Sequence, residues 1–151
     1  MRQAVSVVLL PEKSIAELAI QLSRELRQGE KRITLGMGDY LPHISLTMGY
    51  MDPEDLQDVK ATLLDIAQTT KPLDLAADSI YTIKKSNFTG LQVRLTPELR
   101  DLHERVTRAL EGKLTHKVEG TIEWVTPPAI EEVVPGWVAN YPTGKSFDVY
   151  N

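Results

Sequence analysis

Three side chains that can do chemistry lie at alternate positions within the stretch 41–50, namely His43, Ser45 and Thr47. Successive side chains of a β-strand point to opposite faces, so a strand here is predicted to carry one imidazole and two hydroxyls on a single face. An imidazole can move a proton near neutral pH, and hydroxyls can hold an anionic group. This face is therefore predicted to line a cleft. The residues of the opposite parity are apolar and are predicted to face the core: Ile44, Leu46 and Met48.

A plainer interpretation of the same residues stays open. A histidine on the solvent face of an antiparallel strand, with Ser and Thr as neighbours, needs no functional explanation. The chain has three histidines, so the tripeptide from His43 to Ser45 carries little information without its context.

Length and composition restrict the class of protein. The chain has 151 residues, which predicts one domain, with 42% apolar and 25% charged residues. A formal net charge of −4 argues against a general nucleic-acid coat, although a small site that grips one phosphate is compatible with it. The absence of cysteine excludes disulfides, thiolate metal sites and a cysteine nucleophile.

The N-terminal apolar run, Ala4 to Leu10, is too short to cross a membrane and is followed at once by Pro11. It also lacks a small-residue cleavage site, so no signal peptide is predicted. A cytoplasmic location is the default expectation.

The hydrophobic pattern predicts alternating strands and helices. Ser14 and Glu17 have the spacing of a capping box, with Gly29 closing the helix that follows. Asp52-Pro53 and Thr96-Pro97 are typical helix starts. We therefore expect an α/β or α+β sheet with helices against it. The expected elements are a strand at 4–10, a helix at 15–26, a strand at 41–50, a helix that starts at 53 and is ended by residues 70–72, strands at 73–83 and 91–95, a helix at 97–110, and short strands at 120–125 and 137–139.

The run Pro42-His43-Ile44-Ser45-Leu46, on a strand between two helices, resembles the first motif of the 2H phosphoesterase superfamily. Within the superfamily, it is similar to the 2′-5′ RNA ligase-like and cyclic phosphodiesterase-like members. The resemblance extends over most of residues 4–112. It implies an α+β, bilobed fold with antiparallel-rich sheets, helices on the outer faces and a central cleft, to which each lobe contributes one His-x-Ser/Thr strand.

Carried over by position, the resemblance makes His43 a catalytic histidine and Ser45 a phosphate-binding hydroxyl. Thr47, Arg94 and Tyr81 are weaker candidates for contacts with the substrate. Arg94 could pair with a phosphate, although an arginine on an exposed strand face is the commoner case. Tyr81 could stack on a base, although a half-buried strand aromatic needs no such role.

The second histidine motif of the family has no match in this chain. His103 falls within a predicted helix, and His116 is followed by Val118 where the motif needs Ser or Thr. Residues 150–151 resemble the lead-in to such a motif. We therefore expect residues 1–151 to form a single 2H phosphoesterase-like domain that lacks the segment with the second motif, through truncation or divergence.

The resemblance implies a phosphoesterase acting on 2′-5′-linked or 2′,3′-cyclic phosphate of RNA or small nucleotides. Its chemistry is metal-free acid/base catalysis by imidazoles, with no cofactor. Asp74, Asp78 and Glu119 are too scattered to suggest a metal site. Two alternatives remain, namely a non-catalytic relative that binds a nucleotide or an RNA end, and a structural module in which His43 is incidental. The sequence leaves open the direction of the reaction, the acid or base role of His43 and the oligomeric state.

Overall fold

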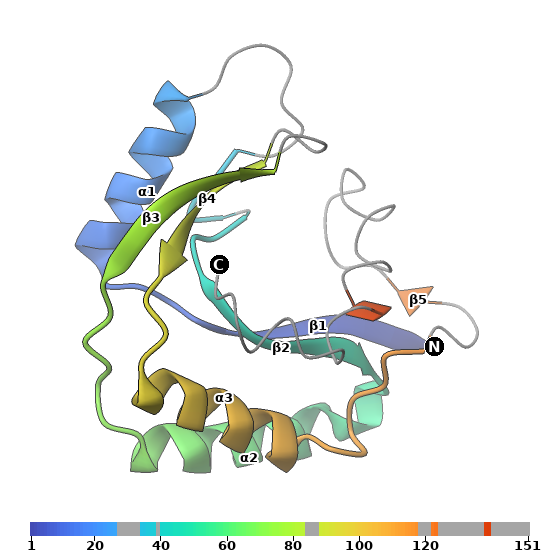
Figure 1. Cartoon of the computed structure of the whole chain (residues 1–151). Helices are drawn as coiled ribbons and strands as arrows, with labels where there is room; N and C mark the ends of the chain where they lie inside the picture. The colour runs from blue at the N-terminus through green and yellow to red at the C-terminus, as the bar shows by residue number, and fades with distance from the viewer. Residues whose placement is uncertain (27–33, 39, 84–87, 118–121, 124–137, 140–151) are drawn as a thin grey trace.

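The computed structural model describes residues 1–26, 34–38, 40–83, 88–117, 122–123 and 138–139 (Figure 1). The order of its elements confirms the predicted one: strand, helix, strand, helix, strand, strand and helix. The elements are β1 (Arg2–Leu9), α1 (Lys13–Glu25), β2 (Ile44–Met51), a 3-10 turn η1 (Pro53–Asp55), α2 (Leu56–Thr69), β3 (Ala77–Ile83), β4 (Phe88–Val93), α3 (Pro97–Ala109) and β5 (Ile122–Glu123).

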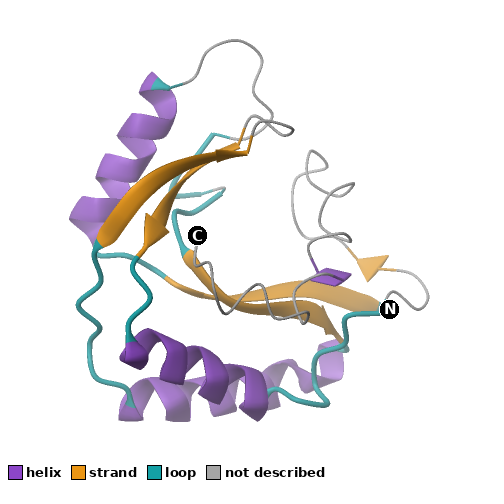
Figure 2. Cartoon of the chain, viewed as in Figure 1, coloured by secondary structure: helices purple, strands orange, loops and turns teal. Residues whose placement is uncertain are grey.

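The strands of the described residues form two separate sheets. One has the order β2-β1-β5, in which β1 runs antiparallel to β2 and parallel to β5. The other is the antiparallel hairpin of β3 and β4. Helices α2 and α3 lie side by side under the first sheet in Figure 2. The predicted α+β class is therefore confirmed, and the first sheet is covered by helices on one face.

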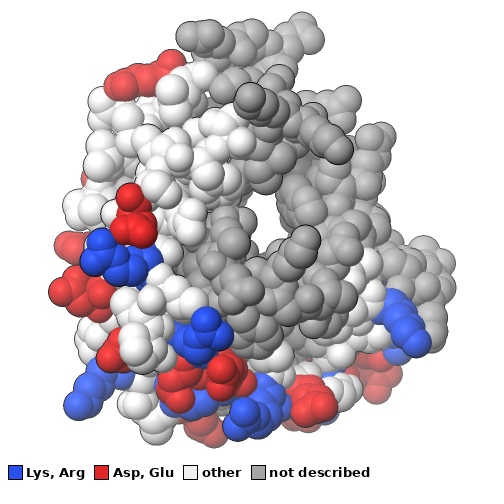
Figure 3. Space-filling model, in the orientation of Figure 1, with Lys and Arg blue, Asp and Glu red and all other residues white. Residues whose placement is uncertain are grey.

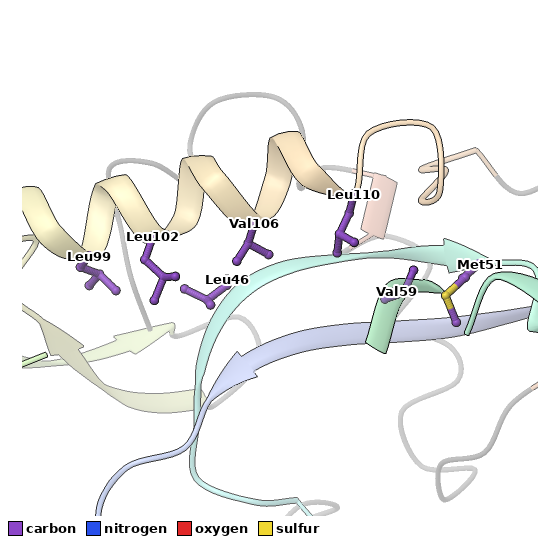
Figure 4. Packing of buried hydrophobic residues seen from close by; sticks show 7 residues of the cluster. All are labelled: Leu46, Met51, Val59, Leu99, Leu102, Val106 and Leu110. Atoms are coloured by element: carbon purple, nitrogen blue, oxygen red, sulfur yellow. The ribbon is translucent and has the colours of Figure 1, made fainter. Parts of the chain in front are cut away.

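The hydrophobic core lies between that sheet and the two helices (Figure 4). Apolar residues at helical spacing in α3 and at its C-cap are buried, namely Leu99, Leu102, Val106 and Leu110, with Leu99 fully inaccessible to solvent. Val59 of α2 is also buried, and its neighbours Leu63 and Ile66 pack against the same cluster. From β1, alternate residues complete the core: Val5, Val7 and Leu9.

Helix α1 differs from α2 and α3. Ala16 and Ile20 are its buried residues, whereas most of its larger apolar side chains are exposed. Ile15, Leu18, Leu22 and Leu26 are 39–57% exposed.

Two of the three predicted helix starts are placed correctly. The Thr96 hydroxyl accepts a hydrogen bond from the Leu99 amide (3.2 Å), which satisfies a free donor in the first turn of α3. Asp52 is the N-cap as expected, and the first turn that follows it is 3-10 rather than α-helical. The capping box at Ser14 is wrong, because α1 begins at Lys13 and places Ser14 inside the helix.

Two strands begin at other residues than predicted. The strand predicted at 73–83 begins only at Ala77, and the preceding Leu73 and Leu75 pack against the core. The strand predicted at 91–95 begins earlier, at Phe88. Val138 and Ala139 have helical backbone rather than the predicted strand conformation. Gly29 and residues 150–151 lie outside the described residues. None of the helices in the described ranges is long and apolar enough to span a membrane.

We expect Leu99→Ala to lower the free energy of unfolding by about 2–5 kcal/mol, because it removes a fully buried side chain and leaves a cavity. Urea denaturation of both proteins measures the difference. Leu64→Ala is the matched control, since Leu64 is 57% exposed and its loss is expected to cost less than about 1 kcal/mol. Equal losses for the two variants would show that the core is not where we place it.

Candidate functional site

His43 lies one residue before β2 and is exposed to solvent. The first residue of β2, Ile44, pairs with Leu9 at the end of β1. Pro42, just before the histidine, is buried and anchors this end of the strand. The imidazole thus projects from a fixed backbone into solvent, which is the accessibility that a proton-transfer group requires.

A backbone carbonyl determines which ring nitrogen of His43 is available. Nδ1 lies 2.6 Å from the Leu41 carbonyl oxygen. A carbonyl oxygen can only accept, so Nδ1 carries the proton and donates it to Leu41. Nε2 is then the nitrogen that can accept a proton in the neutral ring, and the same atom donates one when the ring is charged. Sequence reasoning missed Leu41 because its contribution comes from the backbone, which a side-chain motif does not reveal.

The predicted single polar face of β2 is interrupted by a β-bulge. Val8 pairs with Ser45 and Val7 pairs with Thr47, so Leu46 has no partner of its own. Paired residues of an antiparallel ladder point to the same face. Val7 packs against the core, and Thr47 is therefore on the core face, only 2% exposed. The extra residue reverses the alternation from Thr47 onward.

Ser45 lies on the opposite face, away from α3, and is half-buried. The alternation, continued back to His43, puts the imidazole on the same face as Ser45. The grouping of Thr47 with His43 and Ser45 is wrong, and so is the placement of Met48, which pairs with the exposed Ser6 rather than facing the core. No sequence signal marks the bulge, because polar and apolar residues keep alternating through it.

Thr47 instead contributes to a hollow of about 690 Å³ on the helical side of β2. Arg108 and Glu104 of α3 line it, together with His116. Neither His43 nor Ser45 is among its lining residues, so this hollow is separate from the face that carries them.

The other two histidines are both described, and neither lies near His43. His103 is buried in α3, which covers the core face of the sheet. The sheet thus separates His103 from the face of Ser45. The prediction that His103 belongs to a helix is confirmed.

His116 lies at the far end of β2. Thr115 and Tyr50 exchange two backbone hydrogen bonds of 2.9 and 2.8 Å. The close approach depends on Gly49, where a Cβ atom would come within 2.9 Å of the Leu114 side chain. Six residues of strand separate Ile44 from Tyr50, which is about 20 Å. His116 and His43 therefore cannot contact one phosphate together.

Arg94 follows β4 and is exposed. Its guanidinium donates to the carboxylate of Asp78 over 2.9 Å. An exposed pair of this kind contributes less than about 1 kcal/mol to stability, and it leaves Arg94 partly neutralised toward any phosphate.

Tyr81 has a packing role in the hairpin. A Cβ atom at its cross-strand partner Gly90 would lie 2.5–2.8 Å from the phenol ring, so the ring covers the glycine backbone. Burial raises the pKa of the Tyr81 hydroxyl. One face of the ring is therefore occupied before any base could stack on it.

The surface charge is mixed. Figure 3 shows basic and acidic side chains interspersed over the described surface in this view of the molecule, with neither sign forming a continuous patch. Within the described ranges, no three His, Cys, Asp or Glu side chains gather closely enough to hold a metal ion. Recognition of an anion would thus depend on a few local groups.

The 2′-5′ RNA ligase superfamily model matches residues 11–128, a range that includes His43, Ser45 and all of α3. The chain belongs to this family. The resemblance drawn from the His-x-Ser motif to the 2H phosphoesterases is thereby confirmed. Neither a curated protein nor a solved structure matches the chain significantly.

Burial of His103 leads to a pH prediction. Desolvation lowers the pKa of His103, opposed by Glu104 and assisted by Arg100. The unfolded chain, with a histidine pKa of about 6.5, then binds more protons than the folded chain below that pH. The free energy of unfolding is therefore expected to fall as the pH drops from about 6.5 to 5.

Urea denaturation across this range checks the prediction. His103→Leu should remove most of the slope, whereas His116→Gln, at a half-exposed site, should keep it. Identical slopes in the wild type and in His103→Leu would contradict this assignment.

Proposed function

We propose that this chain is a 2H-type phosphoesterase that acts on 2′-5′-linked or 2′,3′-cyclic phosphate of RNA or small nucleotides. The proposed chemistry is acid/base catalysis by imidazole without a metal. The observation that carries the proposal is His43 itself, exposed at the start of β2 with Nδ1 donating to Leu41 and Nε2 left as its reactive nitrogen. Membership of the 2′-5′ RNA ligase superfamily supports an RNA or nucleotide substrate.

Nε2 of His43 is the atom that would exchange a proton with the substrate. A neutral ring would take the proton of an attacking water or ribose hydroxyl, and a charged ring would give a proton to the leaving oxygen. Both roles use the same nitrogen, so the hydrogen bond to Leu41 serves either direction of the reaction.

Ser45 is the proposed phosphate-binding hydroxyl. It follows His43 by two residues on the same face of the strand. A hydroxyl there can donate to a nonbridging oxygen, where negative charge grows in the transition state. The hydroxyl of Thr47 is excluded from this role because it lies on the core face.

The complementary proton-transfer group does not come from the other two histidines. His103 lies behind the sheet, and His116 is about 20 Å along it. We propose that residues 1–151 form one domain in which the second histidine motif is missing or diverged. A reaction that normally uses two such groups is then expected to be slower by a factor of about 10²–10⁴.

Hydrolysis of a 2′,3′-cyclic nucleotide and of a 2′-5′-linked dinucleotide, both with chelator present, tests the enzyme. His43→Ala is expected to reduce the rate by about 10²-fold or more, because it removes the proton-transfer group. Melting temperature should change by only a few degrees, since the ring is exposed.

His116→Ala is the matched control, a histidine at the other end of β2 that should leave the rate unchanged. The proposal fails if His43→Ala and His116→Ala behave alike, or if chelation alone stops the reaction.

A comparison of hydroxyl deletions tests the assigned faces. Ser45→Ala should weaken binding of a nucleoside 2′- or 3′-phosphate by about fivefold to tenfold, because a hydrogen bond to a charged oxygen is lost. Thr47→Val, which removes a hydroxyl from the core face, should leave the affinity unchanged. Isothermal titration measures both. A larger loss for Thr47→Val would mean that the bulge does not separate the two hydroxyls as described.

A second candidate is a non-catalytic relative that binds a nucleotide or an RNA end. The positions of His103 and His116 favour it, because neither can complete a pair with His43. Two results together would select this candidate over the enzyme. Binding would be saturable, would depend on Ser45 and would persist in His43→Ala, and neither substrate would be turned over.

A further inference from the structure

Ser6 is an exposed residue in the middle of β1. Its cross-strand partner is Met48, and paired residues of an antiparallel ladder point to the same face. Val5 and Val7, on either side of Ser6 in the chain, pack against the core, so Ser6 points away from it. Ser6 therefore shares a face with Ser45, the upper face of β1 and β2 in Figure 1.

The strand register gives the distance between Ser6 and the proposed phosphate site. Val8 pairs with Ser45 and lies two residues after Ser6 on β1. Ser45 and Ser6 are thus diagonal neighbours, and such positions lie roughly 7–8 Å apart. His43 lies on the other side of Ser45, about 7 Å away along the chain. The three polar residues therefore follow one another along this face in the order His43, Ser45, Ser6.

The surroundings of Ser6 differ from those of a phosphate site. The side chains next to it on this face are apolar, namely Ala4, Val8 and Met48. The basic residue on the same side of β1 is Arg2, four residues away, and its guanidinium is paired with Asp52 over 3.4 Å. Among the described residues, no cation beside Ser6 could neutralise a second phosphate.

A nucleoside suits these surroundings better than a charged group does. Its base has apolar faces that can lie against aliphatic side chains. Its ribose and the edge of its base carry donors and acceptors that a serine hydroxyl can match in either role. The exposure of Ser6 shows that the space above this part of β1 is open to solvent.

We propose that Ser6 binds the nucleoside part of the substrate whose phosphate is held at Ser45. Its hydroxyl hydrogen-bonds the ribose or the base edge, and its small side chain leaves room for the ring above β1. The substrate class is then a nucleotide rather than a phosphate ester that lacks a nucleoside. This inference rests on the proposed function for the position of the phosphate, and it can be tested by binding alone.

Isothermal titration with two probes separates the two parts of the site. A nucleoside 3′-phosphate carries both the phosphate and the nucleoside, whereas glycerol 2-phosphate carries the phosphate monoester without a base or ribose. Ser6→Ala should weaken binding of the nucleotide by about threefold to tenfold, the effect of losing one hydrogen bond between neutral groups, and should leave glycerol 2-phosphate unchanged. Ser45→Ala is the matched control, because it should weaken binding of both probes.

Two further variants distinguish the hydroxyl from the space above it. Ser6→Thr keeps the hydroxyl on a residue that suits a strand, so the affinity for the nucleotide should be retained. Ser6→Phe fills the space and should weaken the nucleotide by about tenfold or more, again without effect on glycerol 2-phosphate. Melting temperatures should change by only a few degrees, since the position is exposed. If the phenylalanine variant does not fold, the alanine and threonine variants decide the question.

Equal affinities of the wild type and Ser6→Ala for the nucleotide overturn the proposal, and so does an equal loss for both probes. A wild type that binds the nucleotide no more tightly than glycerol 2-phosphate also overturns it. Absence of hydrolysis contradicts the proposed function alone, because the affinities are measured without turnover. Hydrolysis that depends on His43, combined with an unchanged affinity in Ser6→Ala, overturns the role of Ser6 alone.

Discussion

The packing of α3 against one face of the β2-β1-β5 sheet is the contact on which the rest of the structure depends. Leu99, Leu102 and Val106 seal that face together with Leu46 of β2. Because the core packs on this face, the chemistry proposed for His43 and Ser45 is placed on the opposite face. The same contact distinguishes the two hydroxyl residues of β2, since Thr47 is turned toward α3 and Ser45 is turned away from it. Core packing thus selects which hydroxyl remains a candidate for function.

The elements that the sequence predicts well are those with purely local causes. Thr96 caps α3 because its hydroxyl reaches an amide three residues later, and a cap of that kind is visible in the residue order alone. The buried stripe of α3 follows from helical spacing in the same way. Ser14 shows that a local pattern alone can misplace a helix start. Its spacing to Glu17 fits a capping box, but α1 begins one residue before Ser14, so the pattern falls inside the helix.

The candidate site is predicted only in part, for a physical reason. His43 and Ser45 are proposed from their types and spacing, and the family match covers both positions. The bulge at Leu46 depends on pairing with β1, a partner more than thirty residues away, so strand periodicity alone assigns Thr47 and Met48 to the wrong faces. The acceptor for His43 is a backbone carbonyl. A backbone carbonyl does not belong to any residue type, and residue types are all that a motif contains.

The hydrogen bond between His43 and Leu41 also determines how the ring would respond to covalent labelling. An electrophile that acylates or alkylates imidazoles attacks the nitrogen lone pair, and Nδ1 has none to offer while its proton is directed at a carbonyl. His43 should therefore give a single regioisomer, substituted at Nε2. Buried His103 is shielded from such reagents. The hydrogen bond to one backbone oxygen thus leaves the His43 ring with a single nucleophilic nitrogen, although imidazole has two nitrogens.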